Sequence, residues 1–185
     1  MDENIITNKS TNKIDKNTIK TEKTASNTKK EEVVTVKNWE QLSDVMLKSE
    51  NKKENFTIKL EKGIYTNTGR IKWTNNKIVL TINGNGQTIN ANQNQAFYVY
   101  SNAALVLKNL TIINGNTQQG GAIGNSGNVT IIDSIIANNS AIFDGGAIFN
   151  DGNLTIINSR LTNNFARETA GAIWNIEGNL TIVNS

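Results

Sequence analysis

A repeat of about 25 residues constrains the fold of this chain more than any other feature of its sequence. The segment Gly-Gly-Ala-Ile at 120–123 recurs at 145–148 and, with Ala in place of the first Gly, at 170–173. A second mark, Gly-Asn followed by Val or Leu, Thr and Ile, recurs at 127–131, 152–156 and 178–182. A fixed period of roughly 20–50 residues is typical of solenoids, in which each unit buries its apolar face by stacking on its neighbours.

Three features favour a parallel β-helix over a leucine-rich repeat, which has a similar period. Each unit holds two or three short runs of strand-forming residues and no segment long enough for a helix. Leu154 and Ile156 alternate with Thr155, which is the period of a strand. Asn and Gly recur where bends are needed, and Asn tolerates left-handed backbone geometry. The sequence therefore predicts an all-β fold, a right-handed single-stranded parallel β-helix with about 25 residues per coil.

The period continues towards the N-terminus in a degenerate form. The runs 80–82 and 105–107 are 25 residues apart, and Leu105 lies 24 residues before Val129. The run 58–60 predicts a first coil 22 residues before Leu80. The apolar alternation predicts that the Ile residues of the Gly-Gly-Ala-Ile segments point inward. A step of 24 places Val99 in their column, with Asn corners such as Asn158 and Asn184 stacked as hydrogen-bonded ladders.

The same step of 24 predicts one outward column with aromatic side chains, formed by Tyr100, Gly124, Phe149 and Trp174. Exposed aromatic faces in a row on a rigid sheet could stack on sugar rings. The alternative is structural: the three rings are covered by other segments or only decorate the strands. Gly124 interrupts the row. Tyr100, Phe149 and Trp174 are the candidate ligand-binding residues.

The chain divides into three segments by composition. Residues 1–32 are rich in Asn, Lys, Thr and Ser, which predicts a disordered tail or, less simply, a basic arm for partners. Residues 33–55 hold a short strand and an amphipathic helix that begins at Asn38, with Trp39, Leu42, Val45 and Met46 on one face; these predict an N-terminal cap. Residues 56–185 form the coils, and the chain stops at Ser185 inside a coil, which predicts truncation there and either further coils or self-association.

Composition argues against several classes of function. The chain has no Cys and no His, so thiolate metal sites are excluded and the commonest general base and metal ligand is missing. Residues 1–78 hold 16 of the 19 Lys and Arg residues, so the repeats carry no basic stripe for nucleic acid. No window is apolar enough to span a membrane. We expect no cofactor, no metal, no nucleic-acid partner and no membrane insertion.

The acidic residues of the clear repeats do not predict an active site. Asp144 and Asp151 stand at Gly-containing bends, Asp133 aligns with Asn158, and Glu168 follows Arg167 in one loop. No two carboxylates fall in adjacent strand columns of neighbouring coils, as acid and base catalysis on a polysaccharide would require. We therefore expect that the chain is not an enzyme.

The repeat resembles two groups of proteins. The Gly-Gly-Ala-Ile units, together with the runs 136–139 and 161–164 that end in Asn, resemble the repeat of chlamydial polymorphic membrane proteins, in which this last run begins with Phe. The Asn- and Thr-rich style, as in 78–86, is more similar to adhesin-like surface proteins of methanogenic archaea. The resemblance covers roughly residues 33–185.

The resemblance implies a secreted, pectin-lyase-like β-helix that displays a binding surface. The expected function is a non-enzymatic adhesin-like or display module at the cell surface, with glycans or surface proteins of other cells as partners. The start of the chain, 1–6, does not have the pattern of a signal peptide. Two alternatives remain: part of a carbohydrate-active β-helix (a polysaccharide lyase or hydrolase), or a purely structural spacer.

Overall fold

A computed structural model describes residues 31–185. These residues form a right-handed parallel β-helix of about six turns with about 25 residues per turn and one short helix, which confirms the predicted fold class. The predicted tail lies outside the described residues except for its last two, and the first strand already begins at Glu32.

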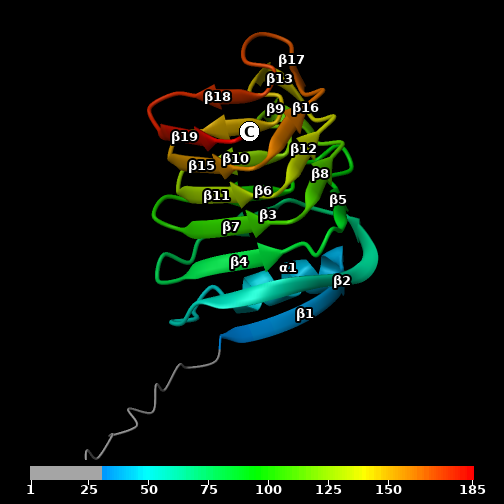
Figure 1. The fold of residues 1–185 in the computed structure, drawn as a ribbon, viewed down its shortest axis with the longest axis vertical. Coiled ribbons are helices and arrows are strands. Elements are labelled where there is room, and N and C mark those ends of the chain that lie inside the picture. Colours follow the sequence, from blue (N-terminus) through cyan, green and yellow to red (C-terminus); the bar gives the residue numbers. More distant parts are fainter. Residues whose placement is uncertain (1–30) are drawn as a thin grey trace, which may run out of the picture. The chain divides into compact units, whose positions relative to one another are not determined.

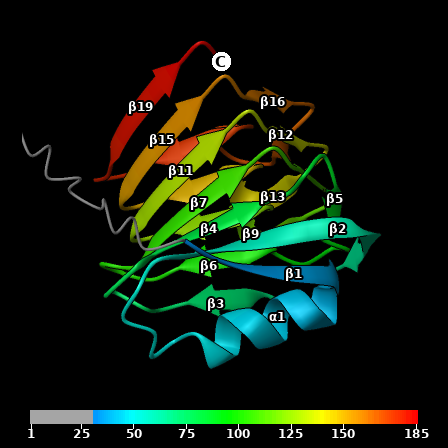
Figure 2. The ribbon, with the colours of Figure 1, turned by 60° about the horizontal axis from the view of Figure 1, so that its bottom comes forward.

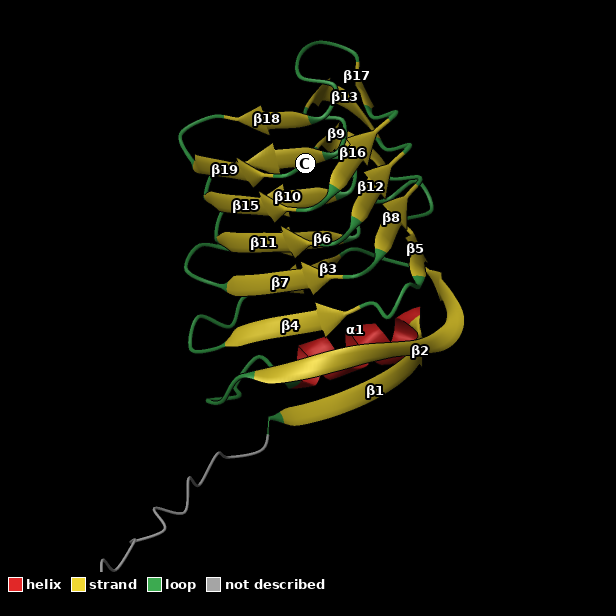
Figure 3. Ribbon diagram, viewed as in Figure 1, coloured by secondary structure: helices red, strands yellow, loops and turns green. Residues whose placement is uncertain are grey.

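The coils stack into parallel sheets (Figures 1 and 3). One path of eleven strands bends around β2 and joins two faces. Its first face contains β1 (Glu32–Asn38), β2 (Phe56–Thr66), β4 (Val79–Asn83), β7 (Ala104–Lys108), β11 (Asn128–Ile132), β15 (Asn153–Ile157) and β19 (Asn179–Val183). Its second face contains β5 (Thr88–Asn90), β8 (Thr111–Ile113), β12 (Ile135–Ala137) and β16 (Arg160–Thr162).

Two further sheets complete each coil. A five-stranded sheet contains β3 (Ile71–Trp73), β6 (Phe97–Val99), β10 (Ile123–Asn125), β14 (Ile148–Asn150) and β18 (Ile173–Asn175). A three-stranded sheet contains β9 (Asn116–Gln119), β13 (Ser140–Asp144) and β17 (Phe165–Ala166). The strands of each coil thus pair with the equivalent strands of the coils before and after, and the faces enclose a core of stacked apolar columns.

The register confirms the main repeat marks. Leu80 pairs with Leu105, Leu105 with Val129, and Val129 with Leu154, and all four side chains are buried. Asn and Asp residues occupy left-handed geometry at the corners as predicted; Asn109, Asp133, Asn158 and Asn184 form one such column, with φ between 48° and 51°. Each buried aliphatic side chain contributes about 1.5–3 kcal/mol, so column stacking is the main stabilising term.

The predicted register is wrong in two of the degenerate coils. In the first coil Phe56, and not Ile58, pairs with Leu80, so the run predicted to stack there is shifted by two residues. In the third coil Phe97, and not Val99, pairs with Ile123. The reason is turn length: four residues (100–103) join β6 to β7, whereas two residues (126–127) join β10 to β11. The step from β6 to β10 is therefore longer than the step from β7 to β11.

The helix α1 (Trp39–Lys48) packs against β1, β2 and β3 at the first coil, as the fold prediction expected (Figure 2). Asn38 Oδ1 accepts a hydrogen bond from the Gln41 N–H (2.9 Å), and Gln41 Oε1 accepts one from the Lys37 N–H (2.8 Å). This reciprocal arrangement satisfies N–H groups at the helix start. Trp39 is buried, with its ring 5.9 Å from that of Phe97. The helix thus covers apolar side chains that a next coil would otherwise cover.

Asparagine side chains connect successive coils in ladders. The amide of Asn125 donates to Asn150 Oδ1 (2.6 Å), and the amide of Asn150 donates to Asn175 Oδ1 (2.5 Å), at a bend where Asn125 and Asn150 are fully buried. A second ladder runs through exposed Asn128, Asn153 and Asn179 (2.8 and 2.7 Å). At the predicted ladder position, Asn158 donates to Asp133 at 3.3 Å. The shorter ladder bonds therefore lie beside the five-stranded sheet and at the start of the first face.

Candidate functional site

The outer side of the five-stranded sheet carries most of the predicted aromatic column. Strand pairing aligns five residues there: Lys72, Tyr98, Gly124, Phe149 and Trp174. Phe149 and Trp174 are neighbours as predicted, with ring centroids 5.4 Å apart. The prediction for Tyr100 is wrong, because the longer turn after β6 moves the register and Tyr98 takes that place.

Tyr100 lies one column further along. It follows β6, in a column with Ser126 and Asp151, whose backbone N–H groups bond to the coil before in the same way. Its ring meets that of Tyr98 edge to face, with centroids 5.0 Å apart. Tyr100 therefore supports Tyr98 from the side rather than extending the row of aromatic faces.

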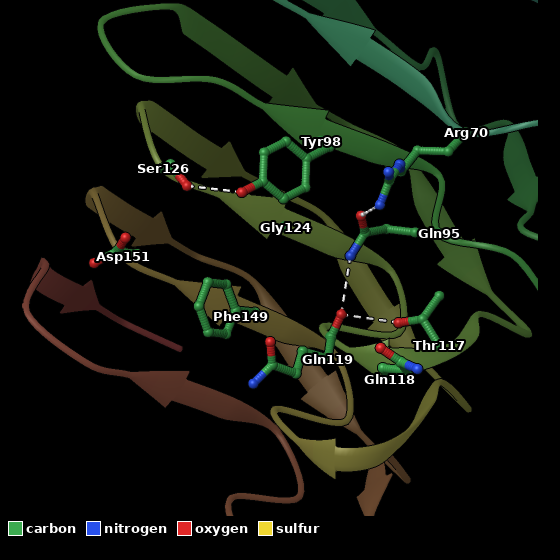
Figure 4. A pocket seen from close by; sticks show the side chains of 10 residues that line it. All are labelled: Arg70, Gln95, Tyr98, Thr117, Gln118, Gln119, Gly124, Ser126, Phe149 and Asp151. Carbon is green, nitrogen blue, oxygen red and sulfur yellow. Dashed lines mark hydrogen bonds between the residues drawn. The ribbon is translucent and has the colours of Figure 1, made fainter.

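A groove of about 460 Å³ lies over this part of the sheet (Figure 4). Its volume is within the range of roughly 300–1,000 Å³ that is usual for small-molecule sites. We use "the groove" for the surface lined by ten residues: Arg70, Gln95, Tyr98, Thr117, Gln118, Gln119, Gly124, Ser126, Phe149 and Asp151. They come from four successive coils, so the groove runs along the axis on which the coils stack.

Gly124 makes the floor of the groove. A Cβ at this position would lie 2.5 Å from Cδ2 of the Tyr98 ring, so only glycine leaves that ring its place. Tyr98 and Phe149 then lie on either side of Gly124 (Figure 4). The Tyr98 hydroxyl is 2.9 Å from Ser126 Oγ, which holds the ring in position. The gap that weakened the predicted row is thus the hollow between two aromatic side chains.

One wall of the groove is a chain of amide groups that ends at an arginine. Gln95 is buried (4% exposed), and its amide nitrogen donates to the carbonyl oxygens of Gln119 (3.0 Å) and Gly120 (2.6 Å). These bonds orient the Gln95 oxygen towards Arg70, whose Nη1 donates to it at 3.1 Å. The Arg70 guanidinium also lies 5.2 Å from the centre of the Tyr98 ring. The buried Gln95 therefore positions an exposed cation at the rim.

The opposite wall carries Ser126 and Asp151 (Figure 4). Asp151 is exposed, and it is the one carboxylate among the residues that line the groove. The groove thus combines two aromatic rings, amide groups, hydroxyl groups, one cation and one anion. This set can stack on a flat ligand with apolar C–H faces and hydrogen-bond to its edges.

The other acidic residues of the repeats lie outside the groove. Asp144 is buried, accepts a hydrogen bond from the Thr169 hydroxyl and lies 3.5 Å from the amide nitrogen of Gln119. Asp144 was interpreted as a bend residue; its side chain in fact connects three coils. In residues 31–185 there is no cluster of three or more Asp and Glu side chains that could hold a metal ion.

Three groove residues escaped the sequence analysis: Arg70, Gln95 and Tyr98. Arg70 and Gln95 lie in degenerate coils, where no repeat mark aligns them with the later ones. Tyr98 had a usable signal: Phe97 and Val99 flank it as apolar neighbours, so strand alternation alone places Tyr98 outward. Counting from the neighbouring sheet was misleading because turn length is not constant.

The chain matches no protein-family model, and comparisons with curated proteins and with solved structures also find no match. Within the described part of the chain, no helix has the length and apolar character needed to cross a membrane. The class of the protein is therefore the one that its fold and groove define, a parallel β-helix with an aromatic and polar groove on its five-stranded sheet.

Proposed function

We propose that this chain is a non-enzymatic, adhesin-like binding module of the cell surface, and that its groove holds glycans. The observation that carries the proposal is the pair of aromatic rings, Tyr98 and Phe149, on either side of Gly124 between two polar walls. The proposal keeps the predicted function and two of its three candidate residues, Phe149 and Trp174, with Tyr98 in place of Tyr100.

The chemistry of the groove supports a sugar as the ligand. A pyranose ring has apolar C–H faces and hydroxyl groups at its edges, so it needs aromatic faces and hydrogen-bonding groups in alternation. The rings of Tyr98 and Phe149 offer the former. The amides of Gln118 and Gln119 and the carboxylate of Asp151 offer the latter.

The scaffold supports tight positioning of these groups. Each strand under the groove is hydrogen-bonded to a strand on both sides, so the backbone does not need to be ordered when a ligand binds. Tyr98 and Gln95 are already held by Ser126 and by backbone carbonyl groups. Sites on rigid elements lose little conformational entropy on binding, which favours a display module.

The enzyme alternative has less support from the groove. Glycoside hydrolysis generally needs two carboxyl groups about 5–9.5 Å apart. Asp151 is the one carboxylate that lines the groove, and no His is present in the chain. A structural spacer remains the alternative if no ligand binds.

The test uses the full chain and a panel of polysaccharides and cell-wall glycans, with both retention and the release of new sugar ends recorded. We expect retention without turnover, and a loss of at least about tenfold in affinity for Phe149→Ala and for Gly124→Ala, in which the new methyl group would displace the Tyr98 ring. Phe165→Ala is the matched control, because Phe165 is exposed (63%) on the separate three-stranded sheet.

Each other result points to a different function. New sugar ends would overturn the binding module in favour of an enzyme and direct attention to Asp151. Retention that is equally strong in Phe149→Ala and Phe165→Ala would place the binding surface outside the groove. No retention of any glycan would favour the spacer.

A further inference from the structure

We infer that the groove selects anionic glycans, with the carboxylate or sulfate of a sugar bound by the Arg70 guanidinium. The inference rests on the proposed function and goes beyond it by naming the class of glycan and its direction in the groove. The anionic group would lie at the end of the groove near β3, and neutral hydroxyl groups would face Asp151.

The first step is that Arg70 is a prepared cation rather than a loose surface side chain. One of its five N–H donors bonds to Gln95, and its guanidinium lies beside the Tyr98 ring. Gln95 is itself buried and held by two backbone carbonyl groups. An arginine that is held in this way needs less ordering when an anion binds.

The second step is that both of these partners are neutral. The ion pairs of residues 31–185 join other residues: Lys37 with Glu61, Lys48 with Asp44, and Lys52 with Glu32. Glu50 lines a neighbouring hollow together with Arg70, but its recorded hydrogen bond is to the Thr74 hydroxyl at 3.3 Å. The positive charge of Arg70 at the rim is therefore not neutralised by a bonded carboxylate.

The third step is that charge is distributed unequally along the groove. Lys72 is exposed on β3 and stands next to Tyr98 in the same column, so two cations lie at this end. Asp151 follows β14, two strands beyond β6, which corresponds to about 10 Å at the usual strand spacing. An anionic sugar is attracted at one end and repelled at the other, so the glycan has a preferred direction.

The fourth step concerns geometry. A planar guanidinium can bind a carboxylate or a sulfate through two parallel hydrogen bonds, which a lysine ammonium cannot do. The aromatic floor beside it would hold the face of the same sugar. The combination of an arginine and a flat apolar surface within one site fits a charged sugar ring better than a free inorganic anion.

The experiment compares binding of four ligands to the full chain by calorimetry: an oligogalacturonate, its neutral carboxyl-reduced counterpart, a short dextran and a short dextran sulfate. We expect at least one anionic ligand to bind about tenfold more tightly than its neutral counterpart, which corresponds to about 1.4 kcal/mol. The oligogalacturonate and dextran sulfate arms distinguish a carboxylate from a sulfate.

Variants assign the effect to the groove. Arg70→Gln is expected to remove the preference while leaving the affinity for the neutral ligand unchanged, and Arg70→Lys to restore only part of it. Arg160→Gln is the matched control, because Arg160 is exposed on β16 in another sheet. Phe149→Ala keeps every charge, so binding that survives it comes from charges outside the groove, including the lysines of residues 1–30.

The outcomes separate this inference from the proposed function. Equal binding of the neutral and anionic ligands, lost in Phe149→Ala, would overturn the inference and leave the glycan module in place. Equal losses for Arg70→Gln and Arg160→Gln would also overturn it, because the preference would then come from general electrostatic attraction. No binding of any of the four would contradict both.

Discussion

The buried asparagine ladder allows a sharp test of what holds the coils together. Asn150 is fully buried and makes two bonds between coils, accepting from Asn125 (2.6 Å) and donating to Asn175 (2.5 Å). Its amide also donates to the Gly152 carbonyl at 3.0 Å. Replacing Asn150 by Ala removes all three bonds at once.

The expected cost follows from the burial of these bonds. A hydrogen bond contributes about 0.5–1.5 kcal/mol net, and a buried polar group left without a partner costs about 1–3 kcal/mol. Three lost bonds therefore correspond to about 3 kcal/mol of unfolding free energy for Asn150→Ala.

Asn153→Ala is the matched control. Asn153 lies three residues further on and also makes two ladder bonds, to Asn128 (2.8 Å) and Asn179 (2.7 Å), but it is exposed. Water replaces the lost partners there, so we expect a cost below about 1 kcal/mol.

Urea unfolding of the full chain and of both variants measures the difference. The midpoint should fall much further for Asn150→Ala than for Asn153→Ala, with an unchanged slope as evidence that the same surface unfolds. Equal shifts would refute the reasoning, because burial would then not determine the strength of the ladders. A cost below about 1 kcal/mol for Asn150→Ala would show that inward apolar stacking alone holds the register.

Two further predictions concern the ends of the described segment. Burial raises the pKa of the Tyr65 hydroxyl, which donates to the Val36 carbonyl (2.6 Å), above its usual value of 10.0. Above pH 10 the unfolded chain therefore loses this proton before the folded chain does, so unfolding free energy should fall as pH rises; chemical denaturation across pH 9–11 should show a smaller fall in Tyr65→Phe, and equal falls would contradict this. In the last coil Leu180 (38%) and Ile182 (51%) are exposed, whereas the equivalent Leu154 and Ile156 are buried, so hydrogen exchange should be faster in β19 than in β11. Equal protection in a monomer would count against it, and protection that rises with concentration would support self-association at this edge, the partner expected there.

Much of the fold could be predicted from the sequence because its signal is local and repeated. The steps between Leu80, Leu105, Val129 and Leu154 report a column that strand pairing confirms. The helix cap was also readable, since Asn38 and Gln41 stand at the required spacing before an apolar face. These features depend on residues close in sequence or on one fixed period.

The groove could be predicted only in part. Phe149 and Trp174 were placed correctly in one column because their coils have equal lengths. Tyr98 was replaced by Tyr100 because a turn of four residues breaks the period, and turn length follows from how the chain leaves one sheet for the next. Gly124 was interpreted as a gap, and only the position of the Tyr98 ring explains why glycine stands there.

The sequence by itself determined the class of fold, the direction in which its apolar columns face and the composition that disfavours several kinds of catalysis. Alternation and period are properties of neighbouring residues, so they can be read from the chain alone. The tertiary structure decided which outward side chains meet. Arg70, Gln95, Tyr98 and Gly124 come from three different coils, and they form one groove because stacking places strands about 26 residues apart side by side.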